Sequence, residues 1–124
     1  MIQAIGLDIT EISRIEQDLE KYGQKFIDRI LSPAEQDILA SRADQAQFLA
    51  GRFAAKEAVI KGLGRYLTDR PPYKQIEILR DESGRPQIRL PHGITRKLGA
   101  VECLISISHE RNYAVAMALF QEEQ

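Results

Sequence analysis

The sequence predicts an α+β domain in which helices pack against an antiparallel sheet. A helical block, marked by apolar residues at helical spacing, occupies about residues 12–62. Sequential hairpins are expected after it, because apolar runs alternate with turn residues in the second half of the chain. The chain has 124 residues, which suits a single domain over residues 1–124 with one modest core.

The composition argues against several classes of protein. Charged residues make up 28% of the chain and no apolar run approaches the ~18 residues that span a bilayer, so no membrane segment is expected. The start of the chain lacks the basic region of a signal peptide, which favours a cytoplasmic location. The single cysteine, Cys103, excludes an internal disulfide and multi-cysteine metal motifs. A net charge of −1 gives no general attraction to nucleic acid, so any anion must meet a local basic cluster.

The opening strand is expected over residues 3–9, which alternate strictly. One face carries the apolar residues, whereas Ala4, Gly6 and Asp8 share the other face. Gly6, beside Asp8, has no side chain and leaves room for something to approach. From its position alone, Asp8 is more simply explained as a polar strand end, or as a cap for the next helix, than as a functional residue.

Helices are expected over about residues 12–22, 26–31, 33–42 and 44–62. The third of these begins with a capping box, in which Ser32 and Glu35 flank a proline at the first helical position. Asp44 is expected to open the fourth helix, and Gly62 to end it in a left-handed conformation.

Hairpins and one short helix are expected in the second half of the chain. Residues 63–72, with glycine at one end and a proline pair at the other, predict a loop rather than a domain linker. Strands are expected over residues 76–79, 88–90, 101–108 and 113–120, with a helix over 91–98. The first strand is placed beside the last two, and residues 121–124 are expected to fray.

Glu57 is the most unusual residue of the long helix. Leu49, Phe53, Glu57 and Lys61 recur at intervals of four, so they lie along one line of the helix. This line places a carboxylate within an apolar stripe, where burial without a partner is unfavourable. Lys61 is one candidate partner. Taken alone, however, Glu57 and Lys61 are more simply a surface pair contributing roughly 0.2–0.5 kcal/mol.

Other candidate residues can also be explained by ordinary structural roles. Asp8 and Glu57 could hold a hard cation such as Mg²⁺, which needs few protein ligands, although their spacing does not show that they meet. His109 ends an apolar strand, where a hydrogen-bonded structural histidine is more common than a catalytic one. Arg14, Lys21 and Lys25 could dock an acidic partner, but such a cluster is usually a solvated face.

Four segments resemble the motifs of the 4′-phosphopantetheinyl transferase family, in its short bacterial holo-[acyl-carrier-protein] synthase form. They are residues 6–15 (GLDITEISRI), 48–58 (FLAGRFAAKEA) with Lys61 after it, 84–86 (GRP) and 105–109 (ISISH). They stand in family order, and the second is quite specific. The run after Lys61 departs from the Gly-Thr-Gly-like run of many relatives. Lys21 stands where some relatives carry arginine.

The resemblance implies the family's fold and its activity. The phosphopantetheine arm of coenzyme A would be moved onto a serine of an apo-acyl carrier protein, releasing 3′,5′-ADP, with Mg²⁺ and in fatty-acid biosynthesis. The implied catalytic residues are Asp8, Glu57 and Lys61, of which Asp8 and Glu57 would be the metal ligands. The implied coenzyme A contacts are Arg52, Lys61, Gly84, Arg85, Pro86, Ser108 and His109, and the implied carrier contacts are Arg14, Lys21 and Lys25. The family's short form is a homotrimer with active sites between subunits.

Two other functions compete with the transferase. A metal-dependent hydrolase of coenzyme A, or of a related pyrophosphate, could use the same acidic pair with water as the nucleophile. A non-enzymatic protein could bind coenzyme A or carrier proteins without needing a metal. Within the transferase itself, the base that accepts the serine proton could be Glu57 or a water molecule on the metal.

Overall fold

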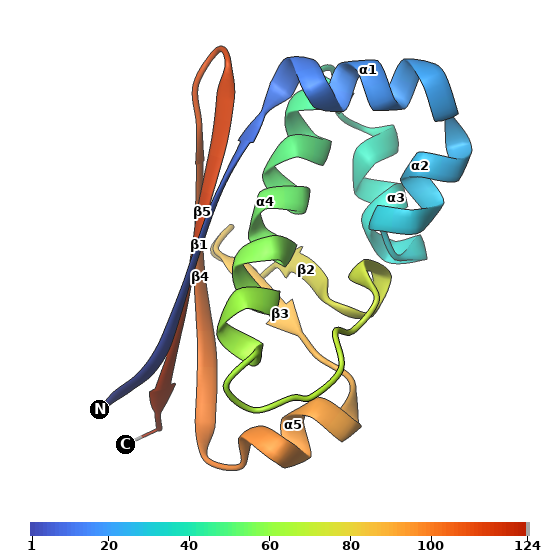
Figure 1. Cartoon of the computed structure of the whole chain (residues 1–124). Helices are drawn as coiled ribbons and strands as arrows, with labels where there is room; N and C mark the ends of the chain where they lie inside the picture. Colours follow the sequence, from blue (N-terminus) through green and yellow to red (C-terminus); the bar gives the residue numbers. More distant parts are fainter. Residues whose placement is uncertain (124) are drawn as a thin grey trace.

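A three-stranded antiparallel sheet carries the helices on one of its faces, as the computed structural model of the chain shows for residues 1–123 (Figure 1). Strand β5 (Tyr113–Glu122) lies in the middle, with β1 (Ile2–Glu11) at one edge and β4 (Val101–His109) at the other. The long helix α4 (Gln45–Leu63) packs across this sheet. The predicted α+β fold and the place of the first strand beside the last are therefore confirmed.

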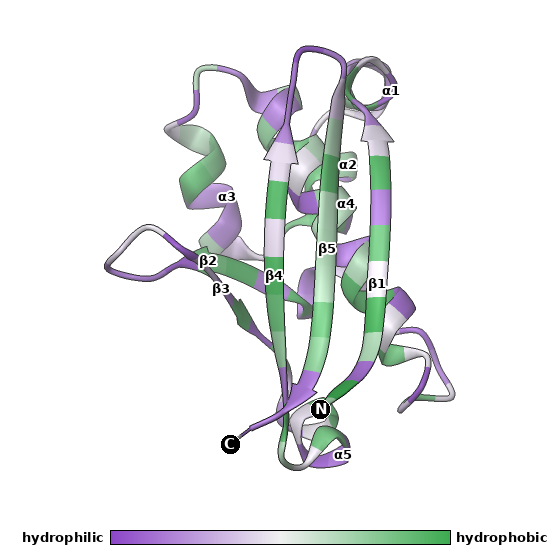
Figure 2. Ribbon diagram, turned by 90° about the vertical axis from the view of Figure 1, so that its left-hand side faces the viewer, coloured by the Kyte–Doolittle hydropathy of each residue, from purple (hydrophilic) through white to green (hydrophobic). Residues whose placement is uncertain are grey.

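The remaining elements lie on the same face of the sheet as α4 (Figure 1). They are α1 (Ile12–Tyr22), α2 (Gln24–Ile30), α3 (Pro33–Ala40), the 3₁₀ turn η1 (Tyr73–Gln75), the antiparallel pair β2 (Glu77–Arg80) and β3 (Pro86–Arg89), and α5 (His92–Leu98). The β2–β3 hairpin lies next to the β4 edge (Figure 2). None of the helices in residues 1–123 is long and apolar enough to cross a membrane.

The helix starts follow the signals in the sequence. The side chain of Ser32 accepts a hydrogen bond from the Glu35 amide at 3.3 Å, and the Ser32 amide donates to Glu35 at 2.9 Å, which completes the capping box. The side chain of Asp44 accepts from the Gln47 amide at 3.0 Å and caps α4. Both predicted starts are confirmed.

The predicted end of α4 at Gly62 is wrong. The helix continues to Leu63, and its cap, Gly64, has a right-handed φ of −55°. Gly62 is needed for packing instead, because a Cβ there would lie 2.1 Å from the ring of Phe120. Gly6 meets the same helix from β1, where a Cβ would lie 1.7 Å from the carbonyl oxygen of Ala58. The expected close approach at Gly6 is thus made by α4.

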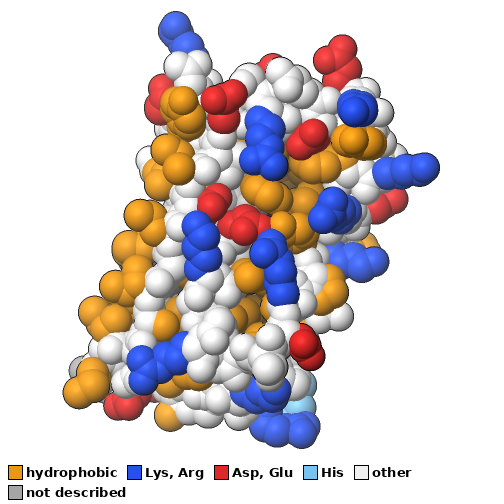
Figure 3. All heavy atoms as spheres, viewed as in Figure 1, with side chains coloured by type: hydrophobic (Ala, Val, Ile, Leu, Met, Phe, Trp, Pro, Cys, Tyr) orange, Lys and Arg blue, Asp and Glu red, His pale blue; other side chains and the backbone are white. Residues whose placement is uncertain are grey.

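The two faces of β1 have unequal roles. The face with the small residues packs on α4, whereas apolar side chains line the side of the sheet that points away from the helices and is open in the described chain (Figure 3). Ile5, Leu7 and Ile9 are 57%, 59% and 65% exposed. The core forms instead between α4, β5 and the β2 segment, around small and aliphatic residues such as Ala54, Ala58, Ile76, Ile78 and Phe120.

The end of the chain is more ordered than predicted. Strand β5 includes Gln121 and Glu122, and the amide of Glu123 donates to the carbonyl of Ala100 at 2.9 Å. The predicted fraying is therefore wrong for residues 121–123, because β4 and β1 continue the pairing to this end of the sheet. Residue 124 lies outside the described residues.

Candidate functional site

The line of residues that carries Glu57 leaves the core as it runs along α4. Leu49 is fully buried, Phe53 and Glu57 are partly buried, and the side chain of Lys61 is 52% exposed. The side chain of Glu57 is 16% exposed, so the carboxylate is largely buried in the apolar stripe, as predicted, and needs a partner. Most other residues of α4 are buried, so this line of residues is the part of the helix that becomes exposed to solvent toward Lys61.

Glu57 forms an ion pair with Arg70, in the loop after α4. Its Oε1 accepts hydrogen bonds from Arg70 and from the hydroxyl of Tyr73. Burial, and then the hydrogen bond to Glu57 and the charge of Glu57, raise the pKa of Tyr73. Lys61, the partner considered from the sequence, pairs with Asp8 instead of Glu57. Neither Arg70 nor Tyr73 lies in a recognised motif, so the sequence carried no signal for this pairing.

Lys61 pairs with Asp8. Its Nζ lies 3.2 Å from Asp8 Oδ1 and donates to the carbonyl of Leu7 at 2.8 Å. Thr10 donates to the other carboxylate oxygen of Asp8 at 3.0 Å. Since Lys61 follows Glu57 by one helical turn, these contacts place Asp8 beside the turn that carries Glu57. Figure 3 shows acidic and basic side chains close together near the middle of the face that it draws.

This acidic pair, Asp8 and Glu57, suits a cation that takes few protein ligands. Within residues 1–123 no three His, Cys, Asp or Glu side chains are grouped to hold a metal ion. Mg²⁺ is commonly bound by one or two carboxylates, with water and substrate phosphates in its other positions. Each carboxylate already faces a positive side chain, Lys61 or Arg70, which shows that positive charge is favoured at both. The donor set therefore fits Mg²⁺ and does not fit a closed structural metal site.

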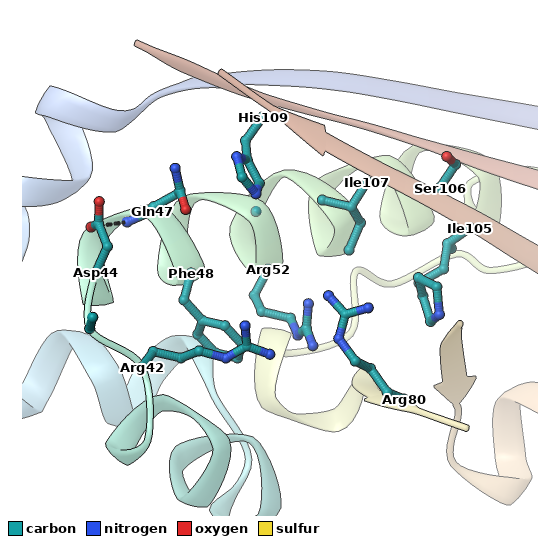
Figure 4. A pocket seen from close by; sticks show the side chains of 13 residues that line it. Arg42, Asp44, Gln47, Phe48, Arg52, Arg80, Ile105, Ser106, Ile107 and His109 are labelled. Carbon is teal, nitrogen blue, oxygen red and sulfur yellow. Dashed lines mark hydrogen bonds between the residues drawn. The ribbon is translucent and has the colours of Figure 1, made fainter. Parts of the chain in front are cut away.

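A second feature, which we call the arginine pocket, opens at the β4 edge. Its volume is about 460 Å³, and it lies between the start of α4, the β2–β3 hairpin and β4 (Figure 4). Arg42, Arg52, Arg80, Pro86 and His109 are among its lining residues. The guanidinium groups of Arg52 and Arg80 point toward one another. Because like charges converge there, the pocket suits an anion.

Arg52 is the buried member of this group. Its side chain is 4% exposed, packs on the ring of Phe48 at 4.6 Å and lies 3.9 Å from Glu35. Its Nε and Nη2 are buried and find no hydrogen-bond partner among residues 1–123. Burial lowers the pKa of Arg52 to about 10, an effect that Glu35 opposes and that Arg80 and Arg42 increase. Buried donors without partners are unfavourable, so an anion would satisfy them.

The residues predicted for coenzyme A are therefore divided between two places. Arg52, Pro86 and His109 line the arginine pocket, whereas Lys61 lies with the acidic pair. Gly84 and Arg85 form the exposed turn next to Pro86, and Ser108 is exposed just before His109. Arg42 and Arg80 line the same pocket and were missed, because neither belongs to a recognised motif.

The acidic pair and the arginine pocket lie on different sides of α4. Asp8 belongs to β1 and His109 to β4, and these strands form opposite edges of the sheet (Figure 2). Within one chain, the structure pairs Asp8 with Lys61, one helical turn after Glu57, and places Arg52 and His109 together in the arginine pocket. The prediction that all of them serve one bound molecule is not met by a single copy.

The basic residues predicted for an acidic partner lie on α1 and α2. Arg14 lines a hollow of about 140 Å³ with Phe26, Arg29, Phe53 and Tyr73. Lys25 lines a neighbouring hollow that also contains Phe26 and Arg29, and Lys21 lies over the ring of Tyr22 at 5.2 Å. Tyr73 belongs to the first hollow and also bonds Glu57, so this basic surface adjoins the acidic pair.

Comparison with known proteins identifies the family. The model of the 4′-phosphopantetheinyl transferase superfamily matches residues 4–118. The chain belongs to this superfamily. It is 42% identical over 120 residues to a holo-[acyl-carrier-protein] synthase of Protochlamydia amoebophila, covering 97% of this chain and 98% of the relative. It is 44% identical over 119 residues to the synthase of Chlorobaculum parvum, covering 94% and 97%.

Solved structures of these transferases share the fold. The holo-[acyl-carrier-protein] synthase of Neisseria meningitidis has a TM-score of 0.88 at 31% identity, covering 98% of this chain and all of that one. The synthase of Bacillus anthracis, described in complex with CoA (3′,5′-ADP), has a TM-score of 0.82 at 33% identity, covering 99% of both. The resemblance stated from the motifs is thereby confirmed.

The four motif segments of this transferase divide in the same way as its site residues. Residues 6–15 and the end of 48–58 build the acidic pair, on β1 and α4. Residues 84–86 and 105–109 border the arginine pocket, on the β2–β3 hairpin and β4. The start of 48–58 reaches that pocket too, through Phe48, Gly51 and Arg52. Among the elements within residues 1–123, helix α4 is thus the one that contributes residues to both places.

Proposed function

We propose that this chain transfers the 4′-phosphopantetheine arm of coenzyme A to a serine of an acyl carrier protein, with Asp8 and Glu57 holding Mg²⁺. The near full-length similarity to holo-[acyl-carrier-protein] synthases carries this proposal. The carboxylates at the family's motif positions support it, since oxygen ligands suit Mg²⁺ and both side chains are mostly buried.

The reaction exchanges one phosphorus–oxygen bond for another. The serine oxygen bonds to the phosphorus that carries the pantetheine arm, and the bond from that phosphorus to the bridging oxygen breaks. The bridging oxygen leaves with the electron pair as part of 3′,5′-ADP, and the serine proton passes to a base near the acidic pair. Bound Mg²⁺ would supply a Lewis acid for the charge on the diphosphate oxygens.

Lys61 has the position to act on the leaving side. Its ammonium group bonds Asp8 and is half exposed, so it can reach a diphosphate bound at the acidic pair. A fixed positive charge there stabilises the negative charge that grows on the leaving oxygen. The carboxylate of Asp8 keeps the ammonium group oriented before substrate arrives.

The arginine pocket is assigned to the remaining phosphate of coenzyme A. The diphosphate is needed at the acidic pair, which leaves the 3′-phosphate on the ribose as the other anionic group. The unpartnered donors of Arg52, with Arg42, Arg80 and His109 around them, suit such a phosphomonoester. The turn of Gly84 and Arg85 and the nearby Ser108 would border the nucleotide.

One coenzyme A would then require two copies of the chain. In one copy the acidic pair and the arginine pocket lie on different sides of α4. We assign the protein a homotrimeric state, in which the pocket of one subunit faces the acidic pair of the next. The apolar face of β1 supports this assignment, because Ile5, Leu7 and Ile9 are exposed in one chain and would be covered between copies.

The carrier protein is assigned to the surface of α1 and α2. Arg14, Lys21 and Lys25 provide positive charge, and Arg29 extends it toward Tyr73. An acidic carrier docked there would bring its serine next to Glu57, since Tyr73 links the two places. The place in fatty-acid biosynthesis and the cytoplasmic location remain predictions of the sequence.

Intact-mass measurement tests the activity directly. Apo-acyl carrier protein, coenzyme A and Mg²⁺ are incubated with this protein. A mass gain of one phosphopantetheine per carrier is expected, and a chelator should prevent it. Asp8→Ala and Glu57→Ala should abolish the gain while keeping the circular dichroism spectrum, whereas Glu82→Ala, an exposed turn carboxylate, should not. Free phosphopantetheine formed without carrier would instead indicate the hydrolase, and binding without any product the non-enzymatic protein.

A further inference from the structure

Arg70 forms an ion pair with the carboxylate that is assigned to the metal. Its guanidinium donates to Glu57 Oε1 and, at 2.6 Å, to the hydroxyl of Tyr73. The same guanidinium lies 5.2 Å from the centre of the Tyr73 ring. Tyr73 in turn packs on Phe53 of α4, with ring centres 5.4 Å apart. The loop between α4 and η1 is thus folded back onto α4 by contacts that converge on Glu57.

We infer that Arg70 is a counter-ion that competes with the divalent cation for Glu57 and moves to the diphosphate of coenzyme A when the substrate binds. The inference rests on the proposed function and goes beyond it. It makes metal binding and coenzyme A binding interdependent. Arg70 opposes metal binding at Glu57 until coenzyme A is bound, because the diphosphate then gives Arg70 a new partner.

The balance of charge at the acidic pair leads to this interdependence. Two carboxylates, Asp8 and Glu57, already face two cations, Lys61 and Arg70. A divalent ion added to this group adds two positive charges beside two existing ones, with no new negative charge. A diphosphate supplies that negative charge, and guanidinium binds phosphate oxygens well. Metal bound without coenzyme A is therefore opposed, and metal bound with it is not.

Arg70 can move, whereas Tyr73 is held in place. The side chain of Arg70 is 55% exposed on a loop, and exposed ion pairs of this kind hold weakly. Tyr73 is less exposed, begins η1 and packs on Phe53, so its hydroxyl can stay on Glu57 after Arg70 leaves. The chain thus separates a fixed donor from a mobile cation at the same oxygen.

Manganese binding provides a readout that does not depend on turnover. Free Mn²⁺ is counted by its electron paramagnetic resonance signal, with the full-length protein alone and with coenzyme A, in the absence of carrier protein. We expect Arg70→Ala to tighten Mn²⁺ binding without coenzyme A by about five-fold or more, in the range of ordinary coupling between ligands. The factor by which coenzyme A improves Mn²⁺ binding should fall by the same amount. Arg70→Gln, which keeps a donor without the charge, should behave likewise.

Arg65→Ala is the matched control. Arg65 lies in the same loop and carries the same charge, but donates to the backbone oxygen of Gln3 at 2.5 Å instead of to a carboxylate. Its loss should leave both affinities unchanged. The inference is overturned if Arg70→Ala and Arg70→Gln bind Mn²⁺ no more tightly than the native protein without coenzyme A, or if Arg65→Ala shows an equal gain.

Glu57→Ala separates this inference from the proposed function. If Glu57→Ala binds Mn²⁺ as the native protein does, the assigned metal site is wrong and the role of Arg70 is wrong with it. If Glu57→Ala loses Mn²⁺ while the Arg70 variants match the native protein, the metal site stands and only the competition by Arg70 is refuted.

Discussion

Lys56 and Glu35 form an ion pair that is sealed inside the protein. The Lys56 ammonium lies 2.5 Å from Glu35 Oε1, and both side chains are fully buried. Lys56 also donates to the carbonyl of Ile30 at 2.6 Å, and Glu35 accepts from the amide of Ile78 at 3.1 Å. Burial lowers the pKa of Lys56, against the pull of Glu35. The pair joins α2, α3, α4 and β2 next to Arg52.

Removing one partner of this pair should destabilise the fold strongly. Lys56→Met leaves the Glu35 carboxylate buried without its cation, which costs about 3–5 kcal/mol in comparable cases. Urea unfolding at a fixed protein concentration measures the loss. Lys74→Met, at an exposed position of η1, should change the free energy of unfolding by less than about 0.5 kcal/mol. Equal effects of the two changes would contradict a structural role for the pair.

Gly62 should be intolerant of any side chain. Gly62→Ala places a Cβ 2.1 Å from the Phe120 ring, and overpacking of this kind costs roughly 1–3 kcal/mol. Gly93→Ala in α5 is the control, because a Cβ there has no neighbour within 4 Å in the described chain. Thermal unfolding compares them. A smaller side chain at position 120, as in Gly62→Ala with Phe120→Leu, should recover part of the loss.

Cys103 should react slowly with alkylating reagents. Burial raises the pKa of its thiol to about 12, from an ordinary value of 9.0. At pH 9 the unfolded chain is then about half thiolate, whereas the folded chain holds almost none, so iodoacetamide should react at least ~100-fold more slowly with the folded protein. The proton is bound more tightly in the folded state, so the stability that this thiol contributes is lost as the pH rises above 9.0. Comparable rates in native buffer and in urea would contradict this burial.

The order and type of the elements were predictable because local signals specify them. The capping box at Ser32 and the cap at Asp44 act over a few residues, and the sequence pattern alone predicts both. The choice between the faces of β1 was not local. Both faces are possible packing surfaces, and α4 selects the small one because only Gly6 lets the Ala58 carbonyl approach.

The candidate site was predictable only where a motif covers it. Asp8, Glu57 and Arg52 stand in recognised segments, but their partners do not. Arg70 reaches Glu57 from a loop 13 residues later, and Arg80 reaches the arginine pocket from β2. The separation of the two halves of the site by α4 follows from the sheet order, which the spacing of motifs along the chain does not contain.

The apolar face of β1 should hold the copies together. Leu7→Lys puts a charge at a side chain that is 59% exposed in one chain and covered in the proposed trimer. Light scattering should then report monomers, and transfer activity should fall with it. Tyr22→Lys, at a 51% exposed aromatic on α1, should leave the oligomer intact. A native protein that is monomeric at micromolar concentration would refute the shared active site.

Arg52 should recognise the 3′-phosphate of coenzyme A and no other part of it. A hydrogen bond to a charged group contributes about 1.5–3 kcal/mol, so Arg52→Ala should raise the KM for coenzyme A roughly 10- to 100-fold. Dephospho-coenzyme A lacks that phosphate, and the native protein and Arg52→Ala should use it with similar KM. Because both substrates are compared on the same variant, a general loss of folding cannot imitate the difference. Arg96→Ala, at an exposed position of α5, should match the native protein with both. An equal loss with the two substrates would instead place the 3′-phosphate outside the arginine pocket.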